Sequence, residues 1–303
     1  MNQEDFAALA ARLDDSPDHR VLRRLTPRKQ FTADVGGPLR RGVVLDTETT
    51  ALDPSRGKII EIGLVAFDYR PDTGQPVRVT GAYGGLEDPG HPLSAEIVEI
   101  TGITDSMLAG QRIDETSVAS LVGGASIVIA HNAEFDRPFF ENRFPSLNRL
   151  PWGCSMIDID WNAEKLGSRK LDYIAFQLGF FFDAHRAEED CHALLEILAL
   201  PLPISRVAGL KPVIDRLANP AFTVLALNSP FATKDLLKGR QYRWNAEDRI
   251  WYRTVQGTDM LAAEYAWLKA NVYGGCPARI EVIERDAWTR FSRCPVSRQE
   301  VTL

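Results

Sequence analysis

Short apolar runs separated by turn-forming residues dominate the chain between residues 42 and 83. Runs of this length, bounded by Asp-Pro and Pro-Asp-Thr-Gly sequences, are typical of buried strands joined by tight connections. We therefore expect three consecutive strands of one sheet: RGVVLDTET at 41–49, KIIEIGLVAF at 58–67 and PVRVTGAY at 76–83.

From residue 94 onward, the apolar residues recur mainly with a helical period. Three hairpin-like strands followed by alternating helices and strands are typical of a mixed α/β sheet. The predicted helices are 94–101, 114–122, 135–144, 169–179 and 187–199, and the predicted strands are 126–130 and a short one near 152–157. We expect residues 42–200 to form one domain.

The two ends of the chain differ from this central region. Residues 1–41 contain a predicted helix at 4–13 and a basic patch, and we expect an appendage that packs on the main domain in preference to a free binding arm. Prolines concentrated in 201–220 predict a linker to a smaller α+β domain at 221–303. Its expected elements are a strand at 222–227, a helix at 232–239, a hairpin at 241–255, a helix at 259–272 and a strand at 279–284.

The composition excludes several classes of protein. The chain has 303 residues, of which 45% are hydrophobic and 25% charged, as in an ordinary globular protein of about two domains. The net charge of −6 excludes a basic coat for nucleic acid. It does not exclude an enzyme that acts on nucleic acid, because a metal site made of carboxylates is itself acidic.

The cysteines and the N-terminus indicate the compartment. The four cysteines form no CxxC pair, so a zinc ribbon is not expected and reduced thiols are the simplest interpretation. There is no run of about 18 apolar residues that could span a membrane, and acidic residues stand where a signal peptide has basic ones. We predict a cytoplasmic protein with no membrane partner.

Candidate chemistry begins with two acidic residues in the first predicted strand. Asp46 and Glu48 are two residues apart, so both side chains point to one face of the sheet. Neighbouring carboxylates repel each other, and a divalent cation with oxygen ligands, such as Mg²⁺, neutralises them. For this pair alone, a solvated strand end is the simpler interpretation.

Two further acidic residues lie at the starts of predicted helices. Asp136 follows a strand and is flanked by phenylalanines, a position where a carboxylate also serves as a helix N-cap. Asp190 lies on the apolar face of the helix at 187–199, and a carboxylate that points inward requires a partner such as a shared metal. His185, five residues earlier, can lie near the same centre without being a ligand.

Together these residues form an ordered set of three motifs. DTETT at 46–50, HNAEFD at 131–136 and HRAEED at 185–190 resemble the three exonuclease motifs of the DEDDh family, over about residues 40–200. The resemblance implies a ribonuclease H-like fold. It also implies that Asp46, Glu48, Asp136 and Asp190 bind two Mg²⁺ or Mn²⁺ ions and that His185 is the general base.

The chemistry agrees with these residue types. Two metal ions roughly 3.5–4 Å apart can stabilise both the attacking and the leaving oxygen, and a histidine with a pKa near 6.5 can accept a proton from water. Similarity to the family further implies that four residues line the substrate cleft: Thr49, Leu52, Asn132 and Phe135. Core packing is an equal alternative for Leu52 and Phe135. The family often has glycine where this chain has Ala51, and we expect an adjusted turn with activity retained.

The hairpin at 241–255 offers a second candidate surface. Arginines and aromatic residues alternate there, as on surfaces that bind single strands by base stacking and phosphate contacts. We expect Tyr242 and Trp244 to share one face of the hairpin. The alternative is that the aromatic side chains pack on the helix at 259–272 while the arginines are solvated. The candidate nucleic-acid contacts are Arg240, Tyr242, Arg243, Trp244, Arg249, Trp251 and Arg253.

The sequence therefore predicts a metal-dependent 3′→5′ exonuclease that releases 5′-mononucleotides from single-stranded nucleic acid, with DNA favoured over RNA. One alternative is a proofreading subunit bound to a DNA polymerase or a repair complex. Another is a module that binds nucleic acid without catalysis, although all five site residues are present.

Overall fold

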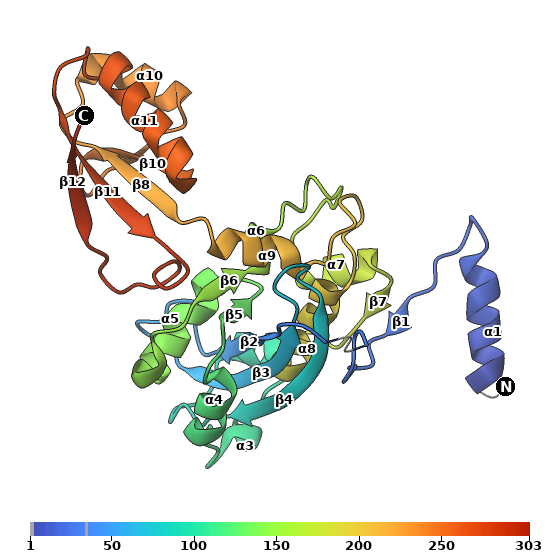
Figure 1. Ribbon diagram of the computed structural model, residues 1–303. Helices are drawn as coiled ribbons and strands as arrows, with labels where there is room; N and C mark the ends of the chain where they lie inside the picture. The colour runs from blue at the N-terminus through green and yellow to red at the C-terminus, as the bar shows by residue number, and fades with distance from the viewer. Residues whose placement is uncertain (1–2, 34–35) are drawn as a thin grey trace.

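The computed structural model describes residues 3–33 and 36–303 and contains two five-stranded sheets (Figure 1). The first sheet has the strand order β4-β3-β2-β5-β6, in which β2, β3 and β4 pair antiparallel and β5 and β6 continue in parallel. Its strands are β2 (Arg40–Thr49), β3 (Ile59–Tyr69), β4 (Pro76–Leu86), β5 (Ile127–Ala130) and β6 (Trp152–Cys154). The three consecutive strands, the mixed sheet and the ribonuclease H-like α/β class are confirmed.

Helices cover both faces of this sheet, because its central strands have apolar residues on both faces. On one face Val44 and Val65 pack against α7 (Leu171–Gln177) and α8 (Ala187–Ala199). On the other, Val43 packs in a core with residues of α4 (Glu115–Val122) and α5 (Ala133–Arg143). The remaining elements of this region are α2 (Ala95–Thr101), α3 (Asp105–Leu108), η1 (Pro145–Leu147), α6 (Ser155–Asp158) and β7 (Phe180–Phe181). The strand expected near 152–157 is shorter than predicted because α6 begins at Ser155.

The segment 201–220 is not an extended linker throughout. Residues Leu210–Leu217 form α9, and Leu210 and Val213 are fully buried in the core beneath the first sheet. Pro212 falls within the first turn of this helix, where its missing N–H costs no hydrogen bond. The prolines therefore did not prevent a helix from forming.

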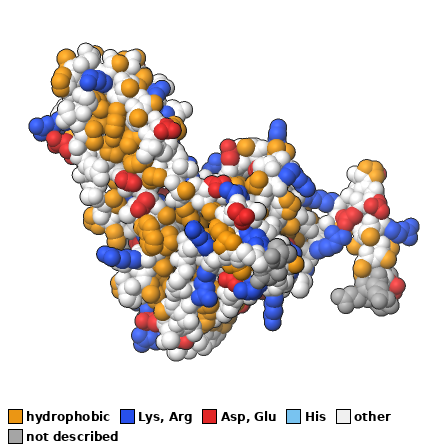
Figure 2. Space-filling view, viewed as in Figure 1, with side chains coloured by type: hydrophobic (Ala, Val, Ile, Leu, Met, Phe, Trp, Pro, Cys, Tyr) orange, Lys and Arg blue, Asp and Glu red, His pale blue; other side chains and the backbone are white. Residues whose placement is uncertain are grey.

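The N-terminal helix α1 (Gln3–Asp14) forms as predicted but does not pack on the main domain. Its Phe6, Leu9 and Leu13 are 60%, 42% and 41% exposed. The helix projects from the rest of the chain in Figure 1 and in Figure 2. The contact with the main domain is made instead by the basic residues that follow the helix. Strand β1 (Arg23–Arg24) pairs with β7, and Arg20 stacks on Phe176.

The second sheet is antiparallel and has the order β12-β11-β8-β10-β9. Its strands are β8 (Ala221–Ala226), β9 (Arg243–Asn245), β10 (Ile250–Gln256), β11 (Arg279–Arg285) and β12 (Arg298–Thr302). The helical elements beside it are η2 (Phe231–Thr233), α10 (Lys234–Gly239) and α11 (Gly257–Asn271). Strand β12 was not predicted from the sequence.

The chain between β11 and β12 returns to the first sheet and contacts α5. Arg137, only 1% exposed, donates hydrogen bonds of 2.6 Å to the carbonyl oxygens of Trp288 and Arg290. The backbone N–H of Trp152 donates to the carbonyl of Ala287 at 2.7 Å, and Phe291 packs against the core on the α5 face. The domain boundaries stay a prediction, and residues 286–293 belong structurally with the first sheet.

No helix in the described part of the chain has the length and apolar character needed to cross a bilayer. The cytoplasmic location stays a prediction.

Candidate active site and metal centre

Strand β2 directs two carboxylates to one face of the first sheet. Asp46 and Glu48 follow Val44, so alternation places them on the face covered by α8, as predicted. Thr47 lies between them, points toward α5 and is 4% exposed. The pairing register of β2 with β3 shifts between Glu48 and Thr49, so the ladder is irregular where the site begins.

Helix α8 can approach this face because β3 has a glycine there. Gly63 pairs with Asp46, and a Cβ atom at Gly63 would lie 2.2 Å from the carbonyl carbon of Ala187, in the first turn of α8. No side chain fits in that space. Gly63 therefore allows Asp190, on the same helix, to reach the strand.

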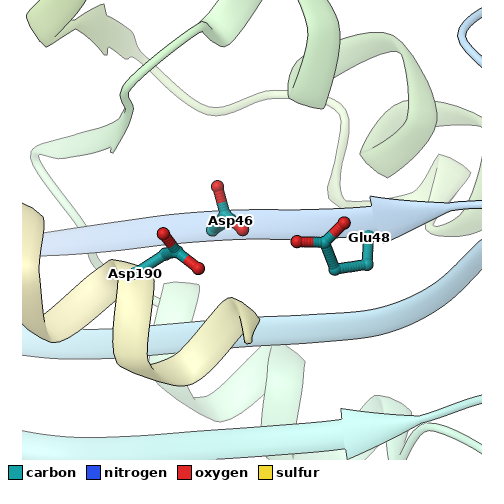
Figure 3. A group of neighbouring side chains, drawn as sticks. All are labelled: Asp46, Glu48 and Asp190. Carbon is teal, nitrogen blue, oxygen red and sulfur yellow. The ribbon is translucent and has the colours of Figure 1, made fainter. Parts of the chain in front are cut away.

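Three carboxylates meet at this point. Asp46, Glu48 and Asp190 each offer an oxygen atom, and these atoms all lie within 4.8 Å of one another. Figure 3 shows the Glu48 carboxylate turned toward the two aspartates. Among the described residues, no lysine or arginine forms an ion pair with any of the three. Three oxygen donors without a cation of the protein suit a hard divalent ion such as Mg²⁺ or Mn²⁺.

Asp136 approaches the other side of β2 and is not one of these three. It lies on α5, is 3% exposed, and its Oδ1 accepts hydrogen bonds from the backbone N–H and the hydroxyl of Thr47 at 3.0 and 2.8 Å. Its charge nevertheless acts on Asp46, whose pKa it raises. Thr47 was not singled out in the sequence, although its place between the two acidic residues of β2 makes it the natural contact for a carboxylate on α5.

His185 lies at the edge of the same site. It directly precedes Arg186 at the start of α8, has a positive φ of 68° and is 58% exposed at the side chain. Its Nδ1 is 3.8 Å from Oε1 of Glu48. A non-glycine residue in this conformation costs free energy and is frequent at functional sites.

Burial and mutual repulsion raise the pKa of all four carboxyl groups. Burial raises the pKa of Glu48 to about 8, with further contributions from the charges of Asp190 and Glu61. Burial likewise raises the pKa of Asp136 and of Asp190 to about 7, and the pKa of Asp46 lies well above its ordinary value. A divalent cation would offset the cost of ionising these groups together.

A fifth buried acid, Glu61, is neutralised by the protein itself. It lies opposite Glu48 on β3, is 4% exposed, and pairs with Arg186 at 3.1 Å. It also accepts a hydrogen bond of 3.2 Å from the backbone N–H of Ala187. Glu61 and Arg186 therefore fix the first turn of α8, which lies between His185 and Asp190. The sequence offered a signal for Glu61 only in its isolated charge within an apolar strand.

A comparison with protein families decides which family this arrangement represents. The RNase T exonuclease family model matches residues 43–198, about half of the chain and all of the first sheet except part of β2. The chain belongs to this exonuclease family. With the three motifs in order, the resemblance to DEDDh exonucleases is confirmed.

The relatives of this chain include proteins named as DNA polymerase III. DNA polymerase III PolC-type of Thermotoga petrophila is 33% identical over 203 residues, which are 61% of this chain and 14% of the relative. DNA polymerase III subunit epsilon of Treponema pallidum is 30% identical over 162 residues, which are 50% of this chain and 72% of the relative. The chain thus spans a small part of the PolC-type protein and most of the epsilon subunit.

Solved structures of exonucleases overlap with part of the chain. Exonuclease X in complex with 5′ overhanging duplex DNA has a TM-score of 0.37 and 23% identity, and covers 56% of this chain and 99% of its own. E. coli exonuclease I in complex with a dA16 oligonucleotide has a TM-score of 0.46 and 15% identity, with 61% and 48% covered. At these scores the overlap is no basis for conclusions about function.

Two of the predicted substrate-binding residues are accessible. Leu52 is 86% exposed, so the alternative of core packing is wrong for this residue. Asn132 is exposed at the start of α5. Phe135 is half-buried and packs on Phe139 with ring centroids 5.0 Å apart. Contact of these residues with a nucleotide stays a prediction.

Thr49 and Ala51 form the turn that follows β2. The hydroxyl of Thr49 donates a hydrogen bond of 2.8 Å to the carbonyl of Ala51, and Thr49 is 6% exposed. Ala51 does not adopt a positive φ, so no glycine is required there. The expectation of an adjusted turn is consistent with this geometry, and substrate contact by Thr49 stays a prediction.

The candidate nucleic-acid contacts in and near the second sheet, called the C-terminal sheet from here on, divide into two groups. Tyr242 is 4% exposed and stacks on Trp267 of α11, so it does not share an open face with Trp244, which is 49% exposed. Arg240 and Arg253 both pair with Glu264, at 3.3 and 2.5 Å, and Glu264 is 1% exposed. The alternative that these two arginines lie unpaired on a solvated face is therefore wrong, because a buried carboxylate binds them. Contact of Arg240 and Arg253 with nucleic acid stays a prediction.

The other candidates of this sheet remain accessible. Arg243 and Arg249 are exposed, and Trp251 is half-buried beside Trp244 with ring centroids 5.4 Å apart. Arg249 has a positive φ of 54° in the turn between β9 and β10.

Proposed function

We propose that this chain is a divalent-metal-dependent 3′→5′ exonuclease that removes 5′-mononucleotides from the 3′ end of single-stranded nucleic acid, with DNA favoured over RNA. The observation that supports it most is the group of three carboxylates within 4.8 Å that no arginine or lysine of the described chain neutralises. Membership of the exonuclease family supports the class of reaction.

The four acids would hold the metal ions. Asp46, Glu48 and Asp190 present their oxygens to one point, and Asp136 approaches from the α5 side of β2. When bound, two Mg²⁺ or Mn²⁺ ions would stabilise the charge of the attacking and leaving oxygens of the phosphodiester. Thr47 holds Asp136 in place with two hydrogen bonds, and Glu61 holds the start of α8.

His185 would act as the general base. Its exposed imidazole accepts a proton from the attacking water and passes it to solvent, while the water oxygen bonds to phosphorus. The bond from phosphorus to the 3′ oxygen breaks, and the leaving 3′ oxygen takes a proton from solvent to become a hydroxyl. Nδ1 of His185 lies 3.8 Å from Oε1 of Glu48, so the imidazole lies at the edge of the carboxylate site. Leu52, Asn132 and Phe135, around the entrance, would contact the terminal nucleotide, with Thr49 behind them.

The direct test is the degradation of single-stranded DNA, duplex DNA and short RNA, each labelled at its 5′ end, with Mg²⁺ or Mn²⁺. A 3′→5′ exonuclease shortens the labelled strand one nucleotide at a time and releases unlabelled 5′-mononucleotides. Asp46→Asn and an EDTA-treated sample serve as controls. Immediate release of a labelled mononucleotide would show attack from the 5′ end, and equal rates with Asp46→Asn would place the activity elsewhere.

A second function, proofreading within a polymerase complex, is supported by the names of two relatives, DNA polymerase III PolC-type and subunit epsilon. Binding of the purified chain to a polymerase III catalytic subunit, measured by gel filtration, tests it. Elution of the two proteins in separate peaks at micromolar concentration would argue for a free nuclease.

A further inference from the structure

The C-terminal sheet has a hollow of about 510 Å³ away from the carboxylate site. It lies where the end of β8, η2, α10 and the β9–β10 hairpin meet. Its lining comprises Ala226, Asn228, Ser229, Phe231, Lys234, Lys238, Trp244, Arg249 and Trp251. Three of these residues belong to the hairpin that the sequence marked as a candidate surface.

Two aromatic side chains of this hollow are exposed to solvent. Phe231 is 82% exposed and Trp244 is 49% exposed. Burial of such rings stabilises a fold, so exposed rings do not make that contribution here. Trp251 supports Trp244 from the adjacent strand, and together they present a broad aromatic surface.

The charges of the hollow have one sign. Lys234, Lys238 and Arg249 line it, and no aspartate or glutamate does. Among the described residues, none of these three cations forms an ion pair, whereas Arg240 and Arg253 of the same region share Glu264. Lys234 lies over the Phe231 ring, with Nζ 4.4 Å from the centroid. A surface with unpaired cations beside accessible rings complements a polyanion that has flat apolar groups.

We propose that this hollow binds single-stranded nucleic acid, with bases stacked on Phe231 and Trp244 and phosphates beside Lys234, Lys238 and Arg249. The proposal rests on the proposed function, since it names a second contact for the same substrate. Stacking on aromatic rings does not depend on base identity, so the hollow would hold any sequence. A single strand bound there is held by the protein independently of the carboxylate site.

Point substitutions in the full chain test this better than removal of residues 221–303. Such a deletion would also remove residues 286–293 and leave the buried Arg137 without two of its hydrogen-bond acceptors. Phe231→Ala is the principal variant, because a side chain that is 82% exposed contributes little to folding. Trp288→Ala is the matched control, because Trp288 is 53% exposed but does not line the hollow.

The measurement is fluorescence anisotropy of a labelled oligodeoxythymidylate of about 20 nucleotides in EDTA, which prevents hydrolysis. Loss of one stacked base should weaken binding roughly 5- to 150-fold in Phe231→Ala, with a similar loss in Trp244→Ala and none in Trp288→Ala. Lys238→Ala should also reduce the slope of log Kd against log salt by about 0.7, while Lys269→Ala, on α11, should not.

Wild-type affinity and salt dependence in both Phe231→Ala and Lys238→Ala would overturn the proposal and favour a protein partner for the hollow. Because this assay measures binding without metal, it can fail while 3′→5′ hydrolysis is observed, and it can succeed while hydrolysis is absent. The two proposals are therefore tested separately.

Discussion

Two groups of buried carboxylates in this molecule are neutralised in different ways. Beside the first sheet, Asp46, Glu48 and Asp190 lie within 4.8 Å of one another with no arginine or lysine paired to them in the described part of the chain. In the C-terminal region, Glu264 on α11 is 1% exposed and pairs with Arg240 and Arg253. Of these two acidic sites, only the second is paired with arginines of the protein.

Glu264 with its two arginines is a structural ion pair, whereas the cluster of Asp46, Glu48 and Asp190 has the properties of a functional site. A buried charge that the protein neutralises is destabilising to break but has no need of a ligand. A group of like charges that the protein leaves unneutralised costs stability unless something binds there. Glu61 shares features of both cases. It is a buried acid at the edge of the active site, and Arg186 neutralises it. Glu61 therefore positions α8 and leaves the other acids without an arginine partner.

The largest expected difference between the two groups is in activity. Asp46→Asn should reduce hydrolysis to background, because it removes a metal ligand, whereas Glu264→Gln should hydrolyse a single-stranded substrate at 25 °C. Steady-state assays of the two variants with the same single strand measure this. Equal loss of activity in both variants would mean that hydrolysis depends on Asp46 no more than on Glu264.

The stability of the same two variants should change in the opposite order. Glu264→Gln leaves two arginines without their carboxylate and should lower the free energy of unfolding by about 2–3 kcal/mol, less than for a fully buried pair because Arg240 stays 37% exposed. The metal-free Asp46→Asn variant should have a free energy of unfolding equal to or higher than that of the wild type. The substitution removes one of the carboxylates that repel each other in the site. Urea denaturation checks both.

Substitution of His185 should have the next largest effect. His185→Ala should lower kcat roughly 10²–10⁴-fold, the usual range for a lost general base, and leave metal affinity nearly unchanged. Single-turnover rates with Mg²⁺ and calorimetric titration with Mn²⁺ measure the two quantities. A wild-type kcat in this variant would identify another group as the base.

The smallest effect on activity should come from Thr47. Thr47→Val removes the hydroxyl that bonds Asp136 and retains the backbone N–H bond, so we expect about a 10- to 100-fold loss of activity or metal affinity. Thr47→Ser keeps the hydroxyl and is the matched control. If Thr47→Val and Thr47→Ser have the same kcat, the side chain does not position Asp136.

The sequence was sufficient for the parts of the site that depend on local spacing. Alternation along β2 placed Asp46 and Glu48 on one face, and the helical period placed Asp190 inward. It was not sufficient for contacts between distant segments. The space that Gly63 leaves for α8 depends on the closeness of two elements that are far apart in the chain. The same holds for the contact of Thr47 with Asp136.

The end regions show the same limit. The prolines in 201–220 predicted a linker. Leu210 and Val213 nevertheless pack into the hydrophobic core, and helix α9 forms. In the hairpin, the alternating sequence pattern gave no reason to distinguish Arg253 from Arg249 as a candidate contact. The difference between them is Glu264 on α11, which lies 11 residues beyond Arg253 in the chain and beside it in the fold.

The most direct test of the account is the melting temperature of the wild-type protein at pH 5.5 and pH 8.5, with and without Mn²⁺. Burial raises the pKa of Glu48 to about 8 and of Asp136 and Asp190 to about 7, so the folded protein retains protons that the unfolded chain releases from about pH 4 upward. The free energy of unfolding of the metal-free protein therefore falls as pH rises through this window.

Mn²⁺ should reverse that loss, because it binds the ionised carboxylates of the folded state. We predict a lower melting temperature at pH 8.5 than at pH 5.5 without metal, a rise on adding Mn²⁺ that is larger at pH 8.5, and little rise in Asp46→Asn. A melting temperature that does not respond to Mn²⁺ at pH 8.5, or that rises equally in Asp46→Asn, would contradict the assignment of Asp46, Glu48 and Asp190 as a metal site.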